Sequence, residues 1–132
     1  MKGMLWAGAA MALALPGLAR AEAACGDLKG AKLPHAEVIS AATEKSGAVE
    51  LCKVVVASHP TKDSKIGIEV WIPQGSAWNG KFVQMGNGGF AGSIASARMK
   101  ATAASTGYAV AATDDGHQAQ GTSANWALGH PE

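Results

Sequence analysis

One stretch of the chain, residues 85–92, reads MGNGGFAG and contains four glycines. Because glycine lacks a Cβ, a backbone this rich in it can approach another group closely. Two chemistries use such a loop: its N–H groups can hold the phosphates of a dinucleotide, or they can stabilise the oxyanion that forms during ester cleavage. A plain structural turn is the third interpretation, and the loop alone leaves all three open.

A group of ionisable side chains lies in TDDGH, at the end of the apolar run YAVAATD. Asp114, Asp115 and His117 are of the types that act as metal ligands or as an acid–base set. Sites in α/β proteins form where strands end. The pattern therefore indicates a second possible part of a site, one strand after the glycines.

Spacing weakens the dinucleotide interpretation. Gly86, Gly88 and Ala91 fit G-x-G-x-x-G/A between an expected strand and an expected helix. The acidic residue that binds the ribose should end the next strand, about 20 residues further on. Asp114 ends a strand but lies 28 residues after Gly86. In addition, the fingerprint normally follows the first strand of its domain, whereas other elements come first here.

The elements before the glycines are expected to be a helix and two strands. Residues 35–47 have a helix-like composition, and Gly47 would end that helix. Residues 51–60 form a β-branched run, and residues 65–73 alternate between apolar and polar side chains. These two runs predict an antiparallel hairpin. Asn79-Gly80, in the turn that follows, is a further hairpin signal.

The second half of the chain is expected to form a βαβ unit with a parallel crossover. Its predicted parts are a short strand over 81–86, a helix over 93–105 stopped by Gly107, and a buried strand over 108–114. The fold class is therefore α/β, with an antiparallel hairpin leading into this unit. Because so small a parallel unit has edges that need further strands, we expect the sheet to be incomplete.

Composition excludes some function classes. The chain has 132 residues, of which 48% are hydrophobic and 16% charged, which is enough for one small domain with a core. The formal net charge is +1 with no cluster of Lys and Arg, which argues against nucleic-acid binding. The tryptophans at 71, 78 and 126 are expected to pack in the core or in turns.

The N-terminus has the features of a secretory signal peptide, which we assign to residues 1–21. Lys2 is followed by an apolar stretch of roughly 15 residues, which is short of the ~20 that span a bilayer. Small residues at A-x-A spacing then allow cleavage after Ala21 or Ala23. We therefore expect a secreted or periplasmic protein that has no membrane contact after cleavage.

Two cysteines remain after such cleavage, Cys25 and Cys52. An exported chain meets an oxidising compartment, so a disulfide between them is favoured. A metal site is not expected, because the two cysteines are isolated and no C-x-x-C pair is present.

Four stretches taken together resemble the tannase/feruloyl esterase family: WNGKF, GNGGFAG, GYAVAATDDGH and, near the C-terminus, A-x-WALGHPE. Each stretch alone is weak, but the set occurs in this order and at this spacing in the family. The resemblance covers residues 25–132. It implies the N-terminal part of an α/β-hydrolase domain.

The resemblance also implies an activity and some site residues. The family contains secreted serine esterases that cleave aromatic esters, such as galloyl and feruloyl esters, through a Ser-His-Asp triad. Gly88 and Gly89 match the position whose backbone N–H helps to form the oxyanion hole, and Phe90 would line the acyl pocket. Since the family's triad lies elsewhere, Asp114 and His117 are expected to shape the floor of the site by hydrogen-bonding loops.

The family's nucleophile motif, of the type C-S-x-G-G, is absent from this sequence. Ser93 and Ser123 lack the glycine pattern of a nucleophile elbow. We therefore expect the triad downstream and the 132 residues alone to be inactive. No cofactor is expected in this segment, although the family's lid domain often holds calcium. A dinucleotide-binding unit and a non-catalytic secreted binding module remain as alternatives.

Overall fold

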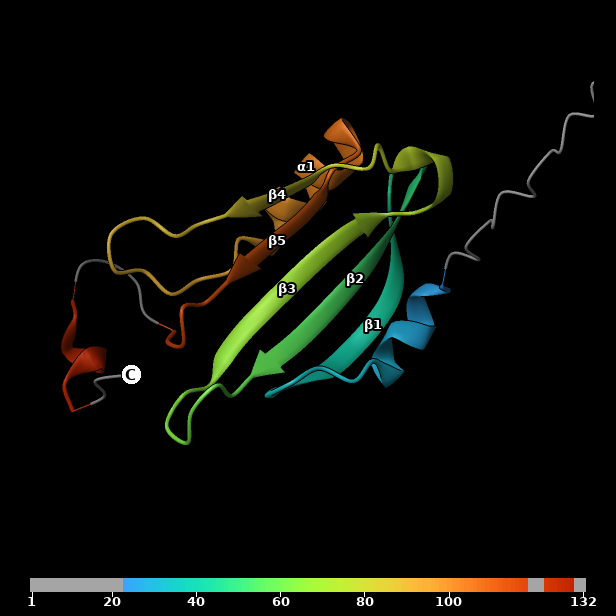
Figure 1. Ribbon diagram of the computed structural model, residues 1–132. Coiled ribbons are helices and arrows are strands. Elements are labelled where there is room, and N and C mark those ends of the chain that lie inside the picture. The colour runs from blue at the N-terminus through green and yellow to red at the C-terminus, as the bar shows by residue number, and fades with distance from the viewer. Residues whose placement is uncertain (1–22, 119–122, 130–132) are drawn as a thin grey trace, which may run out of the picture.

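The computed structural model describes residues 23–118 and 123–129, which form one mixed five-stranded sheet with few helices (Figure 1). The order of strands across the sheet is β1-β2-β3-β5-β4. The strands are β1 (Ala36–Ser46), β2 (Val49–Ser58), β3 (Ile66–Pro73), β4 (Phe82–Met85) and β5 (Ala109–Thr113). The helices are α1 (Ser96–Thr106) and three short 3₁₀ helices, η1 (Cys25–Gly30), η2 (Gly75–Ala77) and η3 (Asn125–Ala127). None of the helices in this described part is long and apolar enough to cross a membrane.

The helix predicted for residues 35–47 is wrong, because these residues form β1, which pairs antiparallel with β2 along its length. The pairing register shifts between Val38 and Ser40, so an extra residue is inserted there. As a result Val38 and Ala41 both pack against the same cluster although they are three residues apart, the spacing typical of a helix. Gly47, with φ of 60°, lies in the two-residue connection to β2.

The hairpin predicted from the next two runs is confirmed, since β2 and β3 pair antiparallel. The hairpin signal at Asn79-Gly80 is misleading, because β5 lies between β3 and β4 in the sheet. The Asn79 side chain instead joins this turn to the end of α1: its Nδ2 donates to the carbonyl oxygen of Thr106 at 2.7 Å. The turn therefore fixes the start of β4 without making a hairpin.

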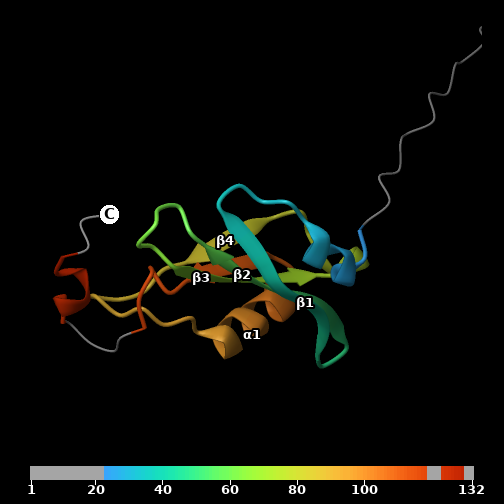
Figure 2. The ribbon, with the colours of Figure 1, turned by 90° about the horizontal axis from the view of Figure 1, so that it is seen from below.

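The predicted βαβ unit is confirmed, since β4 and β5 pair in parallel and α1 connects them. The helix begins at Ser96 and ends where Gly107, in the left-handed conformation with φ of 71°, donates its N–H to the Ala103 carbonyl. Figure 2 shows α1 covering one face of the sheet. The unit therefore brings the carboxyl ends of β4 and β5 to the same edge.

The core has two parts, one on each face of the sheet. On the face covered by α1, the buried residues are Leu51, Trp71, Met99, Ala103, Val110 and Ala112. On the other face, Cys25 from η1 packs with Cys52, Val54 and Val56. The predicted disulfide between Cys25 and Cys52 is present, with Cα atoms 5.5 Å apart, and it attaches η1 to β2.

Candidate functional site

Two loops meet at the carboxyl edge of the parallel strands. The first, which we call the glycine loop, comprises residues 86–95 between β4 and α1. The second, which we call the β5 loop, comprises residues 114–117 directly after β5. The glycines and the Asp and His side chains that the sequence singled out therefore lie side by side, as the parallel pairing of β4 with β5 requires.

Three hydrogen bonds join the two loops and the end of β5. The side-chain amide of Asn87 donates to the backbone carbonyl of Thr113 and to Asp115 Oδ2, both at 2.9 Å. His117 Nε2 lies 2.7 Å from the carbonyl oxygen of Phe90. The conformation of the glycine loop thus depends on residues that lie about 27 positions further along the chain.

Gly92 is required where the two loops touch. A Cβ at this position would overlap the carbonyl oxygen of His117 and would lie 2.6 Å from that of Asp114, both of them rigid backbone atoms. At Gly92, therefore, the close backbone approach that the glycines predict is an approach to the β5 loop.

The centre of the glycine loop is a tight turn in which Ala91 N donates to the carbonyl of Gly88 at 3.2 Å. Gly89 has a φ of 61°, which glycine adopts without strain. No hydrogen bond within residues 23–118 and 123–129 uses the N–H groups of Gly88, Gly89 or Phe90. Three successive backbone donors are thus available to a ligand that carries negative charge.

Asp114 holds the β5 loop against the sheet. Its side chain is 7% exposed, and its Oδ1 accepts the N–H groups of Gly67 at 2.7 Å and of Gly116 at 3.0 Å. A Cβ on Gly67 would lie 2.6 Å from Asp114 Oδ2, so the contact also depends on that glycine. The Asp114 carboxylate therefore accepts hydrogen bonds from backbone donors within the fold.

Asp115 points outward and has an unusual backbone conformation for a non-glycine residue, with φ of 54°. Its Oδ1 accepts the Thr113 hydroxyl at 2.5 Å. Hydrogen bonds from Thr113 and then Asn87, together with the charge of nearby His117, hold the pKa of Asp115 below its usual value. The ionised form of this carboxyl therefore stabilises the contact between the loops.

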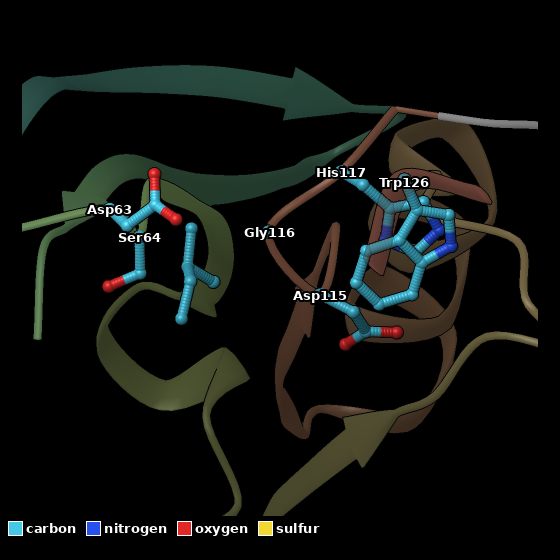
Figure 3. Close-up of a pocket in the computed structure, with 7 residues that line it drawn as sticks. Asp63, Ser64, Asp115, Gly116, His117 and Trp126 are labelled. Carbon is cyan, nitrogen blue, oxygen red and sulfur yellow. The ribbon is translucent and has the colours of Figure 1, made fainter. Parts of the chain in front are cut away.

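His117 also contacts the last described segment. Its ring stacks on that of Trp126, with centroids 3.8 Å apart and planes at 10° (Figure 3). Beside this pair is an open pocket of about 210 Å³, lined also by Asp63, Ser64 and Asp115. Trp126 is 40% exposed and so is not a core residue. Sequence reasoning gave it a packing role but contained no signal for this partner.

A second pocket, of about 280 Å³, lies beside the glycine loop. Gly86, Asn87 and Gly88 line it together with Met85 and Arg98. Gly88 and Gly89 are exposed, and the Phe90 side chain is 52% exposed. Phe90 is not among the residues that line either of these two pockets, so its predicted place in an acyl pocket stays a prediction.

A buried polar cluster fixes the start of α1, immediately after the glycine loop. Glu69, 8% exposed, accepts Trp71 Nε1 at 2.6 Å and the hydroxyl of Ser96, and its other oxygen pairs with Lys53 at 3.3 Å. Sequence reasoning missed this cluster. The available signal was Glu69 itself, a charged residue two positions from a tryptophan on the same face of a strand.

Known esterases are similar in sequence to this chain. The family model described as "Tannase and feruloyl esterase" matches residues 52–132. An uncharacterized esterase of Xanthomonas campestris is 40% identical over 126 residues, covering 86% of this chain and 22% of that protein. A probable feruloyl esterase B-2 of Aspergillus fumigatus is 33% identical over 100 residues, covering 76% of this chain and 18% of that protein. The chain thus spans about a fifth of the length of these relatives.

Among solved structures, feruloyl esterase B from Aspergillus oryzae superimposes with a TM-score of 0.63 at 24% identity, covering 72% of this chain and 22% of that one. The chain accordingly has the α/β-type fold of the matched part of this esterase. The chain belongs to the tannase and feruloyl esterase family.

Proposed function

We propose that this chain supplies the oxyanion-binding side of a secreted or periplasmic serine esterase that hydrolyses aromatic carboxylic esters. One observation carries the proposal. In a member of the tannase and feruloyl esterase family, three successive N–H groups, those of Gly88, Gly89 and Phe90, make no hydrogen bond within the described residues. They lie at the carboxyl edge of a parallel strand pair, where α/β sites form.

The chemistry that these donors serve is acyl transfer. A serine hydroxyl attacks the ester carbonyl carbon, and the carbonyl oxygen becomes an oxyanion that accepts hydrogen bonds from the loop N–H groups. The intermediate collapses, the alcohol leaves and an acyl-enzyme forms. Water then attacks the acyl-enzyme through a second oxyanion at the same donors, which releases the aromatic acid. Removal of one such donor typically costs about 10²–10³ in kcat.

The nucleophile is the part that these 132 residues do not supply. The sequence has no C-S-x-G-G motif, and Ser93 and Ser123 are exposed without the glycines of a nucleophile elbow. The relatives are about four times as long as the chain. In this proposal the triad comes from residues beyond the 132, and the 132 residues alone are inactive.

Two features argue against the dinucleotide alternative. In that fold the pyrophosphate binds at the helix N-terminus, whereas α1 begins at Ser96, five residues after Ala91 ends the glycine pattern. The carboxylate of Asp114, which would bind the ribose, accepts the N–H groups of Gly67 and Gly116 instead.

One structural observation and one prediction from the sequence support export. The Cys25–Cys52 disulfide is the form favoured in an oxidising compartment. The predicted signal peptide, residues 1–21, lies outside the described residues and rests on the sequence alone.

The direct test compares the 132-residue chain with the polypeptide encoded by the complete reading frame. Methyl gallate and methyl ferulate are the substrates, and titration with a nicotinamide dinucleotide is the control for the alternative. We expect the longer polypeptide alone to cleave the esters and to lose cleavage when its downstream serine is changed to alanine. Ester cleavage by the 132 residues, or dinucleotide binding without cleavage, would overturn the proposal.

A further inference from the structure

We propose that His117 is a positioning residue for the oxyanion donors, because its Nε2–H fixes the peptide unit between Phe90 and Ala91. This inference rests on the proposed esterase function. It adds a residue outside the glycine loop on which the rate of the reaction depends.

The argument begins with the peptide unit itself. Its carbonyl, from Phe90, lies 2.7 Å from His117 Nε2, and its N–H, from Ala91, donates to the Gly88 carbonyl at 3.2 Å. The unit is therefore held at both ends. Because peptide units are planar, its orientation fixes ψ of Phe90 and φ of Ala91, and the turn that it closes with Gly88 contains the free N–H groups of Gly89 and Phe90.

Glycine loops need such a restraint. Gly88 and Gly89 have no Cβ, so sterics restrict their backbone little. The Gly88 to Ala91 hydrogen bond closes the turn but does not orient it relative to the sheet. The His117 bond does, because the β5 loop is fixed to β3 through Asp114 and the Gly67 N–H. Preorganised donors stabilise an oxyanion better than donors that must reorganise during the reaction.

The protonation pattern of the imidazole follows from its partner. A carbonyl oxygen only accepts, so Nε2 carries the proton and donates it to Phe90. His117 Nδ1 is buried and makes no hydrogen bond within the described residues. The imidazole therefore gives one polar contact, at Nε2, and one ring contact, with Trp126.

This division allows the two contacts to be separated by mutation. The variant His117→Phe keeps an aromatic ring to stack on Trp126 and loses only the donor. The variant His117→Gln keeps a donor N–H at a length close to that of Nε2 and loses the ring. His59 is a matched control, since its Nδ1 also contacts a loop carbonyl, that of Ser64 at 3.1 Å, outside the glycine loop.

The experiment measures kcat and KM for methyl ferulate with the polypeptide from the complete reading frame, which carries each change in turn. Both chemical steps pass through an oxyanion, so we expect His117→Phe to lower kcat and kcat/KM together, by about tenfold or more, with KM nearly unchanged. His117→Gln should recover most of the rate, and His59→Phe should match the wild type.

A second readout uses the 132 residues themselves and does not depend on esterase activity. Amide hydrogen exchange at Ala91, whose N–H is the hydrogen-bonded one of the turn, should accelerate in His117→Phe and return toward the wild-type rate in His117→Gln. A His117→Phe variant with wild-type kcat and wild-type exchange would overturn the inference. So would a rate loss that His117→Gln shares equally, since that pattern reports the ring contact with Trp126. If the wild-type enzyme cleaves no ester, the proposed function fails, and the exchange data still decide whether His117 fixes the loop.

Discussion

The side-chain amide of Asn87 donates to the backbone carbonyl of Thr113 at 2.9 Å, so the first turn of the glycine loop is attached to the last residue of β5. The two residues are 26 positions apart in the sequence. The same nitrogen also donates to Asp115. This contact supports the loop near its start, three residues before the Phe90 carbonyl that His117 contacts.

Replacement of Asn87 should loosen the loop. In Asn87→Ala both hydrogen bonds are lost, and we expect a loss of about 1–2 kcal/mol in the free energy of unfolding, measured with urea. In the polypeptide from the complete reading frame, the proposed esterase activity should show a kcat about tenfold lower with little change in KM, because the proposed oxyanion donors at residues 88–90 would be less well positioned. Asn79→Ala is the matched control: it removes the 2.7 Å bond to Thr106 at the other end of β4 and should lower stability without lowering kcat. Equal kcat in the two variants would contradict this role for Asn87.

Gly92 should tolerate no side chain. In Gly92→Ala the new Cβ would meet the carbonyl oxygens of His117 and Asp114, so one loop must shift. We expect a loss of about 1–3 kcal/mol, as for other overpacked sites. At Gly86 a Cβ meets nothing within 4 Å, and Gly86→Ala should stay within about 0.5 kcal/mol of the wild type. Urea unfolding of the 132-residue chain measures the free energy of unfolding of both variants. Similar midpoints for the two would show that the glycine loop and the β5 loop are not in close contact at Gly92.

Local patterns were sufficient to predict the βαβ unit. The glycine at 107 ends α1 in the left-handed conformation, and the apolar run at 109–113 forms a strand beside β4. The pairing of the two cysteines was predicted from the expected export to an oxidising compartment. These features depend on short segments or on general chemistry, which a single sequence records directly.

The remaining features depend on contacts between distant residues. The bulge in β1 gives Val38 and Ala41 a helix-like spacing, so periodicity alone predicted the wrong element. Asn79-Gly80 has hairpin composition, yet strand order is decided by where β5 inserts. In the site, the glycines and TDDGH were found from composition, whereas Asn87 and Trp126 act through partners that no local pattern reveals.

Glu69 should be essential for stability. It is 8% exposed and accepts Trp71 Nε1, the Ser96 hydroxyl and Lys53. In Glu69→Ala a buried N–H and a partly buried charge lose their partner, and we expect a loss of about 3 kcal/mol. Glu50→Ala is the matched control, because its ion pair with Lys45 joins side chains that are 54% and 72% exposed and should contribute at most about 0.5 kcal/mol. Chemical unfolding at pH 7 distinguishes the two, and a Glu69→Ala loss below about 1 kcal/mol would show that the cluster contributes little.

Acid should weaken the contact between the two loops through Asp115. Hydrogen bonds from Thr113 and Asn87, with the nearby His117 charge, hold the pKa of Asp115 below its ordinary value of 3.8 in the folded state. A lowered folded-state pKa means that the ionised carboxyl stabilises the fold fully above pH 3.8 and progressively less as the pH falls through the folded-state pKa. Asp115→Asn keeps the shape of the side chain without the charge, so it should be less stable than the wild type at pH 7 and close to it near pH 2. Urea midpoints of both proteins at the two pH values measure this, and comparison with the wild type cancels the effect of the other carboxyls. A stability difference that is the same at both pH values would mean that the charge of Asp115 does not hold the loops together.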